Sequence, residues 1–573
     1  NANKLTINSG GTLSQTSGTL IVGCTNNNSE FLINLGTYTM SGGTLTVNGK
    51  FTNNNPAGSL IQSGGDIIVD GNSGTLATSI NGHIVDMYAL DATKINLTGG
   101  TFTVVDPTLS TTTGNGAFKV YPSNAFTTGA DWTLKLGNGV STDAGGNTDG
   151  FLINLTNTNS MVIGGDVIVN TQGATWAANR HVTTANAVGM KNLTITKGDY
   201  RLTSVNYING TITNNDTLTH HSSSSNLSLA TYTGSAAAVS TNAQTIGGTG
   251  FFRNNLTNAS ISANLIGMTV NNNNATGITL NVPLTLSSTL TMTSGIINTS
   301  ASNLLTLGTA SAAGTLSCTP SATNFINGPF TRTFPIRTAS GTYTVATLFP
   351  VGASSSSLPM YIDPTTTAAT KFTANAYASM PGTSGSGVSN LAALYWSAIP
   401  DNASNVTSAR IQLNHAGITA NSKLLYAQTN SGSYGGTPGG SSSVASTSVT
   451  AGTDINPYYN FYSYGDLVTC SAPSDQATAI APTNKTTTSF TGALSPASSS
   501  PTGYLVVRYA SGATPTDPSN NTLYTVGAAL GAGTVRANIY SSPFQFNETG
   551  LTASTTYDYY VYAFDNSGCA GPT

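Results

Sequence analysis

The stretch GTYTMSGGTLTVNG (Gly36–Gly49) is followed closely by GSLIQSGGDIIVDG (Gly58–Gly71), and the two segments share one pattern. Gly43 and Gly65 occupy equivalent positions, which sets a local period of 22 residues. An earlier copy, GTLSQTSGTLIVG (Gly11–Gly23), aligns with both. Self-similarity at about 20 to 50 residues is typical of solenoids, in which each unit buries its apolar face by stacking on the next. The repeat therefore predicts a stacked β architecture.

Each copy contains a run of four strand-forming residues: Thr19–Val22, Thr44–Val47 and Asp66–Val69. Side chains alternate along a strand, so the second and fourth residues of each run are predicted to form the core and the first and third to face outward. Gly and Asn crowd the ends of the runs, where the backbone has to turn. The same run recurs at Thr101–Val104 and Asp166–Val169.

The patterns along the chain predict an all-β fold with three domains. Residues 1–328 are expected to form a parallel β-solenoid (β-helix) rod with insertions. Residues 329–469 contain short strand-like segments between turn-rich linkers and a Gly/Ser-rich loop, which predicts a β-sandwich. Residues 470–573 are expected to form a second, Ig-like β-sandwich.

Composition excludes several classes of function. Charged residues make up 7% of the chain, against about 25% in ordinary soluble proteins, and the formal net charge is −3. Without a basic stripe, nucleic acid is not an expected partner. No stretch approaches the ~20 apolar residues that cross a bilayer, so no transmembrane segment is predicted. No signal peptide is visible, which indicates either its removal or a piece of a longer protein.

The last hundred residues resemble a fibronectin type III domain. GYLVVRYA (Gly503–Ala510) and LTASTTYDYYVYAF (Leu551–Phe564) are similar to strands of that family, and Tyr557 matches its tyrosine corner, with Ala553 where proline is usual. The resemblance implies that Tyr557 hydrogen-bonds back to the nearby backbone. Only nine residues follow the second segment, so we expect the last strand to be lacking. Either the chain continues past Thr573 or another subunit supplies a strand.

A wider resemblance is carried by SGGTLTVNGKF and SGGDIIVDG in the repeat, by FPVGASSSSLPMYI (Phe349–Ile362), and by GYLVVRYA and VYAFDNSGCAG near the end. These segments resemble the large repetitive surface and secreted proteins of Bacteroidota that are exported by type IX secretion. The resemblance implies an extracellular or cell-surface protein, adhesive or structural in many cases. It implies as partners other copies of the chain, other surface proteins or surface glycans, and Thr217 in Asp216-Thr217-Leu218 as an O-glycan site.

Four cysteines allow three pairings. Cys24 and Cys318 are expected near opposite ends of the rod, too far apart for a bridge. Cys470 and Cys569 bracket the last domain, and a disulfide between them would be consistent with an oxidising exterior. The alternative is four unpaired thiols.

One cluster of aromatic and charged residues is a candidate carbohydrate-contact or catalytic surface. Its members are Trp176, Arg180, His181, Lys197, Asp199, Tyr200 and Arg201. Asp199 or His181 would carry the proton in catalysis. Because the cluster lacks the second carboxylate of a glycosidase, we interpret it as a solvated loop or a carbohydrate-contacting patch, without catalytic residues.

The outward third position of the repeat run is apolar in three copies, at Ile21, Ile68 and Ile168. A stacked row of these side chains would form a patch facing a partner, whereas insertions from the same chain are the alternative cover. Motifs for metal ligands or nucleophiles, such as Cys-x-x-Cys or G-x-S-x-G, do not occur, so no cofactor or metal is predicted.

These observations together predict a non-enzymatic, extracellular structural or adhesive protein: a rod with β-sandwich modules that assembles into a surface filament or layer. The alternative is a polysaccharide-binding or polysaccharide-degrading β-helix protein that works at the face from Trp176 to Arg201.

Overall fold

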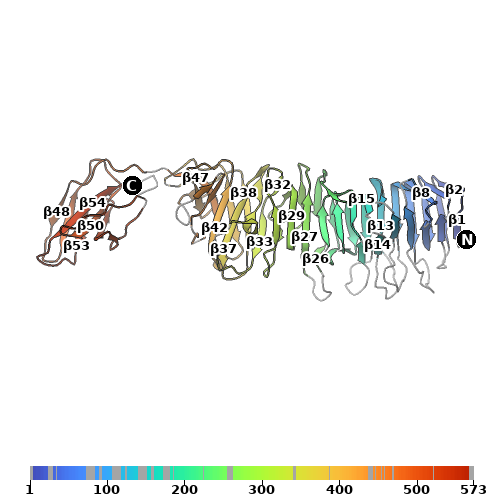
Figure 1. Ribbon diagram of the computed structural model, residues 1–573, viewed down its shortest axis with the longest axis horizontal. Coiled ribbons are helices and arrows are strands. Elements are labelled where there is room, and N and C mark those ends of the chain that lie inside the picture. The colour runs from blue at the N-terminus through green and yellow to red at the C-terminus, as the bar shows by residue number, and fades with distance from the viewer. Residues whose placement is uncertain are drawn as a thin grey trace. The chain divides into compact units, whose positions relative to one another are not determined.

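In the structure, a computed structural model, the regular secondary structure is almost entirely β-strand (Figure 1). It describes residues 4–23, 30–33, 35–53, 55–71, 84–89, 93–105, 118–122, 126–139, 151–155, 161–171, 181–184, 186–222, 225–254, 262–339, 343–385, 387–436, 443–445, 447–452, 454–456, 458–467, 470–520 and 522–566. Within these ranges the helices are two short 3₁₀ turns, η1 (Val345–Thr347) and η2 (Ala403–Asn405). The predicted all-β class is confirmed.

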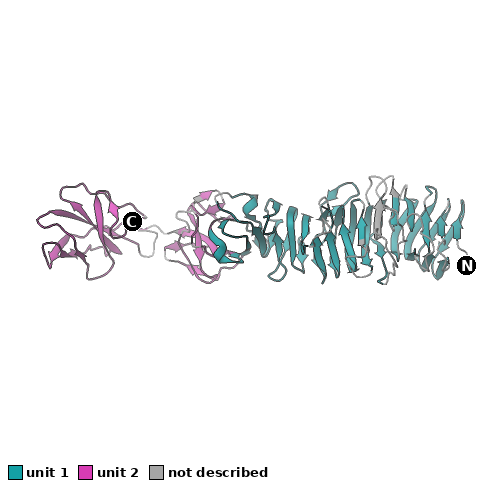
Figure 2. Cartoon of the chain, turned by 90° about the horizontal axis from the view of Figure 1, so that it is seen from below, with its two compact units in different colours: residues 1–376, 399–407 teal, residues 377–398, 408–573 magenta. Residues whose placement is uncertain are grey.

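The chain divides into two compact units, drawn in different colours in Figure 2. The first unit comprises residues 1–376 with 399–407, and the second comprises residues 377–398 with 408–573.

Ten parallel strands of the first unit form one sheet, here called ladder A, in which each strand pairs with the strand one repeat later. The strands, in sheet order, are β1 (Lys4–Ile7), β4 (Glu30–Ile33), β7 (Lys50–Asn53), β9 (Val85–Ala89), β11 (Phe118–Pro122), β14 (Phe151–Leu155), β16 (His181–Thr184), β18 (Asp199–Leu202), β21 (Thr217–His220) and β26 (Phe251–Asn254). Sequence order and sheet order are the same, so the chain advances steadily along the ladder.

Two further parallel ladders, B and C, run beside ladder A and continue past its last strand, β26. Ladder B contains β2 (Thr12–Gln15), β5 (Thr37–Met40), β12 (Phe126–Thr127), β19 (Val205–Ile208), β22 (Asn226–Leu229), β27 (Leu265–Asn271) and β31 (Thr315–Cys318). Ladder C contains β3 (Thr19–Val22), β6 (Thr44–Asn48), β13 (Asp131–Leu136), β20 (Ile212–Asn214), β25 (Gln244–Gly247), β28 (Ile278–Leu280) and β32 (Asn324–Asn327). Long bent strands contribute to both: β8 (Ser59–Asp70), β10 (Ile95–Val104), β15 (Met161–Asn170), β17 (Val188–Lys197) and β29 (Leu284–Asn298).

The register of ladder C reproduces the alignment of the sequence repeats. Thr19 pairs with Thr44, Thr44 pairs with Asp66, and Asp66 pairs with Thr101. The second and fourth residues of the runs are buried, as predicted for Leu45 and Val47, except that Leu20 of the first copy is half-buried; Thr103, predicted to face outward, is also buried. The repeat in the sequence is therefore the stacking register of the strands.

The corner between ladders B and C is a stack of glycines in the left-handed region. Gly18, Gly43, Gly65 and Gly100 have φ values of 72°, 82°, 75° and 94°. A Cβ atom on Gly43 would lie 2.4 Å from the carbonyl oxygen of Gly18. Neighbouring corners thus approach so closely that a side chain has no room, and the predicted glycine corners are confirmed.

A glutamine just before each of two of these corners ties the backbone of adjacent repeats together. Gln62 Nε2 donates to the carbonyl oxygens of Gly65 and Thr101, each at 3.1 Å, and Gln62 Oε1 accepts a 2.9 Å hydrogen bond from Trp132 Nε1. Gln15 occupies the equivalent slot, with Met40 between them in the ladder. The buried glutamine therefore gives corner carbonyls a second hydrogen bond: the Gly18 oxygen accepts from Gln15 Nε2 as well as from the Thr44 backbone N–H.

His220 is the buried histidine at the end of β21. Its Nδ1 accepts a 3.0 Å hydrogen bond from the backbone N–H of Ile266, which makes Nδ1 the unprotonated nitrogen. Burial lowers the pKa of His220 to about 4. Protonation of Nδ1 would replace an acceptor by a donor opposite the Ile266 N–H.

Antiparallel pairing joins the parallel pattern from residue 330 onward, although β33 (Phe330–Phe334) still pairs in parallel with β30 (Leu305–Leu307) on its other side. β33 pairs in an antiparallel manner with β38 (Thr370–Tyr377), whereas β32 still pairs in parallel with β35 (Val351–Ala353). Arg332 is fully buried here, and its guanidinium donates to the carbonyl oxygen of Leu348 at 2.9 Å. The new residue types at this point, arginine and proline, accompany a change of strand direction.

Short strands, most of them paired antiparallel, make up the rest of the chain before residue 470. They are β23 (Thr231–Tyr232), β24 (Ala237–Ala238), β30 (Leu305–Leu307), β34 (Leu348–Phe349), β36 (Ser356–Ser357), β37 (Met360–Thr366), β39 (Thr383–Ser384), β40 (Val388–Ser389), β41 (Tyr395–Pro400), β42 (Val406–Asn414), β43 (Ser422–Ala427), β44 (Ser433–Tyr434), β45 (Ser443–Ala445), β46 (Ser448–Thr450) and β47 (Phe461–Leu467).

From residue 470 onward, two antiparallel sheets share one core. The first sheet contains β48 (Ala479–Thr483), β49 (Phe490–Ser495) and β53 (Gln545–Glu548), and the second contains β51 (Ala529–Leu530), β52 (Gly533–Ile539), β50 (Gly503–Ala510) and β54 (Tyr557–Phe564). Leu494 and Phe546 of the first sheet pack with Tyr504 and Val506 of the second. We call residues 470–566 the last module.

Two predictions about the last module can be compared with the structure. The Tyr557 hydroxyl accepts a 3.2 Å hydrogen bond from the Thr552 backbone N–H, so the predicted return of this tyrosine to the nearby backbone is confirmed. β54 lies at the edge of its sheet, and no strand follows it among residues up to Asn566, the last one described. At Ala563 the backbone N–H of this edge strand donates to Gln476 Oε1, so a side chain already occupies that position.

The glycine corner yields a testable comparison. Gly43→Ala adds both a left-handed strain and a 2.4 Å clash, whereas Gly18→Ala adds the strain alone, since nothing lies within 4 Å of its Cβ position. We expect Gly18→Ala to lower the free energy of unfolding by about 1–2 kcal/mol and Gly43→Ala to lower it at least twice as much. Urea denaturation followed by tryptophan fluorescence measures both, and equal losses would contradict close stacking at this corner.

His220 yields a pH dependence. The unfolded histidine has a pKa of about 6.5, so between that pH and about 4 the unfolded chain binds a proton that the folded chain rejects. The contribution of His220 to stability is therefore complete above pH 6.5 and falls as the pH drops toward 4, by up to about 3 kcal/mol. Urea denaturation at several pH values measures the slope, and His220→Asn is expected to reduce it. An identical slope in the variant would count against the neutral, buried imidazole.

Candidate functional site

The predicted carbohydrate-contact patch falls mainly on ladder A, but the structure separates its members. Trp176 and Arg180 lie outside the described residues, as does the side chain of His181, whose backbone pairs with Asp199. Lys197 is exposed, and its ammonium donates to the Gly139 carbonyl oxygen at 3.3 Å.

Asp199 is the centre of a closed ionic cluster. It is 2% exposed, and its Oδ2 accepts from Arg201 Nε at 2.8 Å and from a terminal guanidinium nitrogen of Arg253 at 3.4 Å. Its Oδ1 accepts from the Thr219 hydroxyl at 2.7 Å. The partners come from three successive strands of ladder A, β18, β21 and β26. The carboxylate is thus occupied by the protein's own donors, and no open position remains for a substrate proton.

Tyr200 points away from this cluster, because neighbouring residues of a strand face opposite sides. It is fully buried, and its hydroxyl donates to Asn206 Oδ1 at 2.7 Å. Burial raises the pKa of Tyr200 well above its usual range. The expectation that Asp199 and Tyr200 offer a contact surface is therefore corrected: one is an ion-pair partner and the other is a core residue.

The outward isoleucines occupy a single column of ladder C. Pairing runs from Ile21 through Thr46 to Ile68, and then through Thr103 and Lys135 to Ile168, so polar residues separate the isoleucines. Ile21 is 61% exposed, whereas the other two isoleucines are half-buried. The role of this row as a partner surface stays a prediction, and Ile21 is the member that is open to solvent.

The structure describes the predicted disulfide only in part. Cys470 is buried and disulfide-bonded, which rules out four unpaired thiols, while Cys569 lies outside the described residues. Cys318 is a free, buried thiol.

Thr217 is 2% exposed, and its hydroxyl hydrogen-bonds to Asp216 Oδ1 at 3.1 Å. A glycan on Thr217 would therefore have to be attached before ladder A forms.

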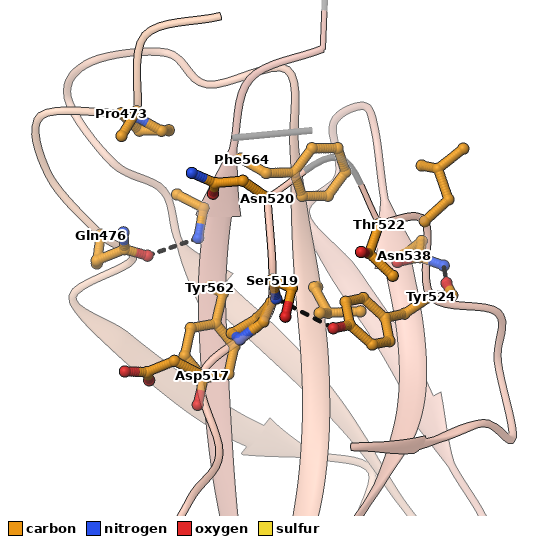
Figure 3. A pocket seen from close by; sticks show the side chains of 15 residues that line it. Pro473, Gln476, Asp517, Ser519, Asn520, Thr522, Tyr524, Asn538, Tyr562 and Phe564 are labelled. Atoms are coloured by element: carbon orange, nitrogen blue, oxygen red, sulfur yellow. Dashed lines mark hydrogen bonds between the residues drawn. The ribbon is translucent and has the colours of Figure 1, made fainter. Parts of the chain in front are cut away.

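A pocket in the last module was not anticipated from the sequence (Figure 3). It has a cavity volume of about 220 Å³ and an apolar floor that includes Leu505, Ala563 and Phe564, all buried. Figure 3 shows Gln476 and Pro473 on one side of Phe564, and Tyr524 with Asn538 on the other. Its residues come from distant parts of the chain, so spacing along the sequence carries no signal for it.

Residues 516–520 and 522–524, which form one wall of the pocket, are held by tyrosine hydroxyls. Tyr509 accepts from the Thr516 backbone N–H at 3.1 Å, and Tyr562 donates to the Thr516 carbonyl oxygen at 3.4 Å. Tyr524 accepts from the Ser519 N–H at 3.0 Å, and its own carbonyl oxygen accepts from Asn538 Nδ2 at 2.7 Å. These bonds fix the wall before any ligand arrives.

Comparison with known proteins finds no matching family model and no matching curated protein. In the described part of the chain, no helix has the length and apolar character to cross a membrane.

The ionic cluster can be tested by removing its central charge. Asp199→Asn leaves Arg201 and Arg253 facing each other without a counter-ion, and the loss of one partner of a buried pair costs about 3–5 kcal/mol. We expect a fall of at least about 3 kcal/mol in the free energy of unfolding, measured by urea denaturation. Lys197→Ala is the matched surface control, with an expected change below about 0.5 kcal/mol. A small change in Asp199→Asn would contradict a structural role for the cluster.

Proposed function

We propose that this chain is an extracellular structural or adhesive protein in which residues 1–328 form a β-solenoid and the following residues form β-sandwich modules, the last of them similar to fibronectin type III. One observation carries the proposal: parallel pairings succeed one another in sequence order through ladders A, B and C. Such stacking supplies length and rigidity, because each repeat buries its core against the next.

The outward surface of the ladders supports a structural role over a catalytic one. Ladder C presents mostly uncharged side chains outward, such as Thr44, Thr46 and Thr101, with Asp66 and Lys135 as charged exceptions. The carboxylate of the candidate cluster, Asp199, is ion-paired with Arg201 and Arg253. A surface of mostly uncharged side chains is suited to packing against a partner rather than to acid–base chemistry.

The extracellular setting is supported by the disulfide at Cys470, since disulfides persist in oxidising compartments. Export by type IX secretion from a member of the Bacteroidota is proposed on the sequence resemblance alone. The proposed partners are other copies of the chain, other surface proteins or surface glycans, in a filament or layer.

Self-assembly is the direct test of this proposal. We expect the purified chain to form filaments or sheets in electron micrographs and to sediment as large species in analytical ultracentrifugation. Ile21→Lys should reduce assembly, because it places a charge on the exposed end of the apolar row, whereas Lys135→Ala in the same column should not. Monomers at every concentration would exclude the filament or layer. Cleavage of a polysaccharide that Asp199→Asn abolishes would instead establish an enzyme.

A further inference from the structure

We propose that the pocket of the last module binds a single neutral sugar unit, such as the terminal pyranose of a glycan. The pocket belongs to residues 472–564 and involves none of ladders A, B and C, so this inference goes beyond the structural role proposed above. It assigns a ligand chemistry to a site that the sequence does not mark.

The interior of the pocket fits the apolar face of a pyranose ring. The cavity of about 220 Å³ is compact, and its apolar lining includes the rings of Tyr524, Tyr562 and Phe564. Aromatic rings supply large, rigid contact area together with a polar tip. A pyranose offers C–H groups on its faces and hydroxyls around its edge, which matches aromatic walls below a polar rim.

The rim carries hydrogen-bonding groups but no cation. Asp517, Asn520 and Thr522 are exposed at the rim, and they supply a carboxylate, an amide and a hydroxyl. None of the described lining residues is Lys, Arg or His. A carboxylate without a cation disfavours uronic acids, sulfated sugars and nucleotides, whereas it accepts hydrogen bonds from neutral sugar hydroxyls.

The pocket is also prepared for binding. Hydroxyls of Tyr509, Tyr524 and Tyr562 hold the loop that carries Asp517 and Asn520. A wall fixed in advance lowers the entropic cost of binding. Neither Asp517 nor Asn520 is needed for these anchoring bonds, so their side chains are available to a ligand.

A proline-rich peptide is the competing occupant, because aromatic grooves also bind such segments. Peptides of this kind lie along an extended groove, whereas this cavity is compact and is bounded on one side by Gln476, which is hydrogen-bonded to the Ala563 backbone. The shape therefore favours one ring-sized unit, and the peptide becomes an outcome of the test.

The test is a titration of the full chain with neutral sugars. Glucose, galactose, mannose, xylose and N-acetylglucosamine are added separately, with glucuronate and galacturonate as charged counterparts and a polyproline peptide as the competitor. Isothermal calorimetry and ligand-observed NMR record binding. We expect at least one neutral sugar to bind with a dissociation constant on the order of 1 mM, as suits a ligand of about 12 non-hydrogen atoms, and its uronic acid to bind at least about 10-fold more weakly.

Variants locate the binding. Tyr562→Ala removes a ring from the pocket and should weaken binding at least about 10-fold. Tyr562→Phe keeps the ring and loses only the long 3.4 Å bond to Thr516, whose loop Tyr509 and Tyr524 still hold, so its binding should stay within about 3-fold. Asn520→Ala and Asp517→Ala change exposed side chains that do not hold the loop, and each should weaken binding by about 3- to 10-fold. Lys485→Ala is the control, since this lysine is exposed in the same module and does not line the cavity.

The proposal is overturned if no neutral sugar saturates the chain, if the peptide alone binds, or if Asn520→Ala and Asp517→Ala leave sugar binding unchanged. Circular dichroism of each variant establishes that the fold is intact. Because binding is measured on the dispersed chain, its failure is separate from a failure of self-assembly.

Discussion

The close approach of backbone to backbone at the glycine corners is the constraint on which the first unit depends. At Gly43 and Gly65 the chain turns with positive φ, and the position of each missing Cβ lies less than 3 Å from the backbone of the preceding corner. Only a residue without a side chain permits the turn and the contact together. With the corners this close, the strands on either side meet at hydrogen-bonding distance, and the buried aliphatic residues stack in columns.

The few charged side chains of this chain show how ion pairs form in a stack of parallel strands. A carboxylate on one strand faces the strands of neighbouring repeats, so Asp199 pairs with Arg253 of another strand of ladder A as well as with Arg201 of its own strand. The pair of Lys4 and Glu30 at 3.2 Å, on the first two strands of ladder A, follows the same logic near the surface. Charges in such a stack act mainly on one another, which explains why a charged cluster in the sequence was not an open site.

The sequence predicted those parts of the fold that repeat locally. The alignment of Thr19, Thr44 and Asp66 in the sequence is also the pairing register of ladder C. Each repeat of 20-odd residues places its strand beside the equivalent strand of the next repeat. The bond from Trp132 to Gln62 joins residues 70 apart, across an insertion of irregular length, and no local pattern reveals it. For the candidate site, proximity in sequence misled, since Asp199 and Tyr200 are adjacent in the chain but face opposite sides of the strand.

The division between repeat and module suggests where recognition can arise in this architecture. A ladder surface places one side chain of each repeat at a regular spacing in a column, so it provides many similar contacts and little discrimination. A pocket needs different residue types at one place. Loops of unequal length bring such residues together, as they do with Pro473, Tyr524 and Phe564 in the last module. Regular stacking therefore supplies extension and strength, while selectivity is confined to the segments in which the repeat has been lost.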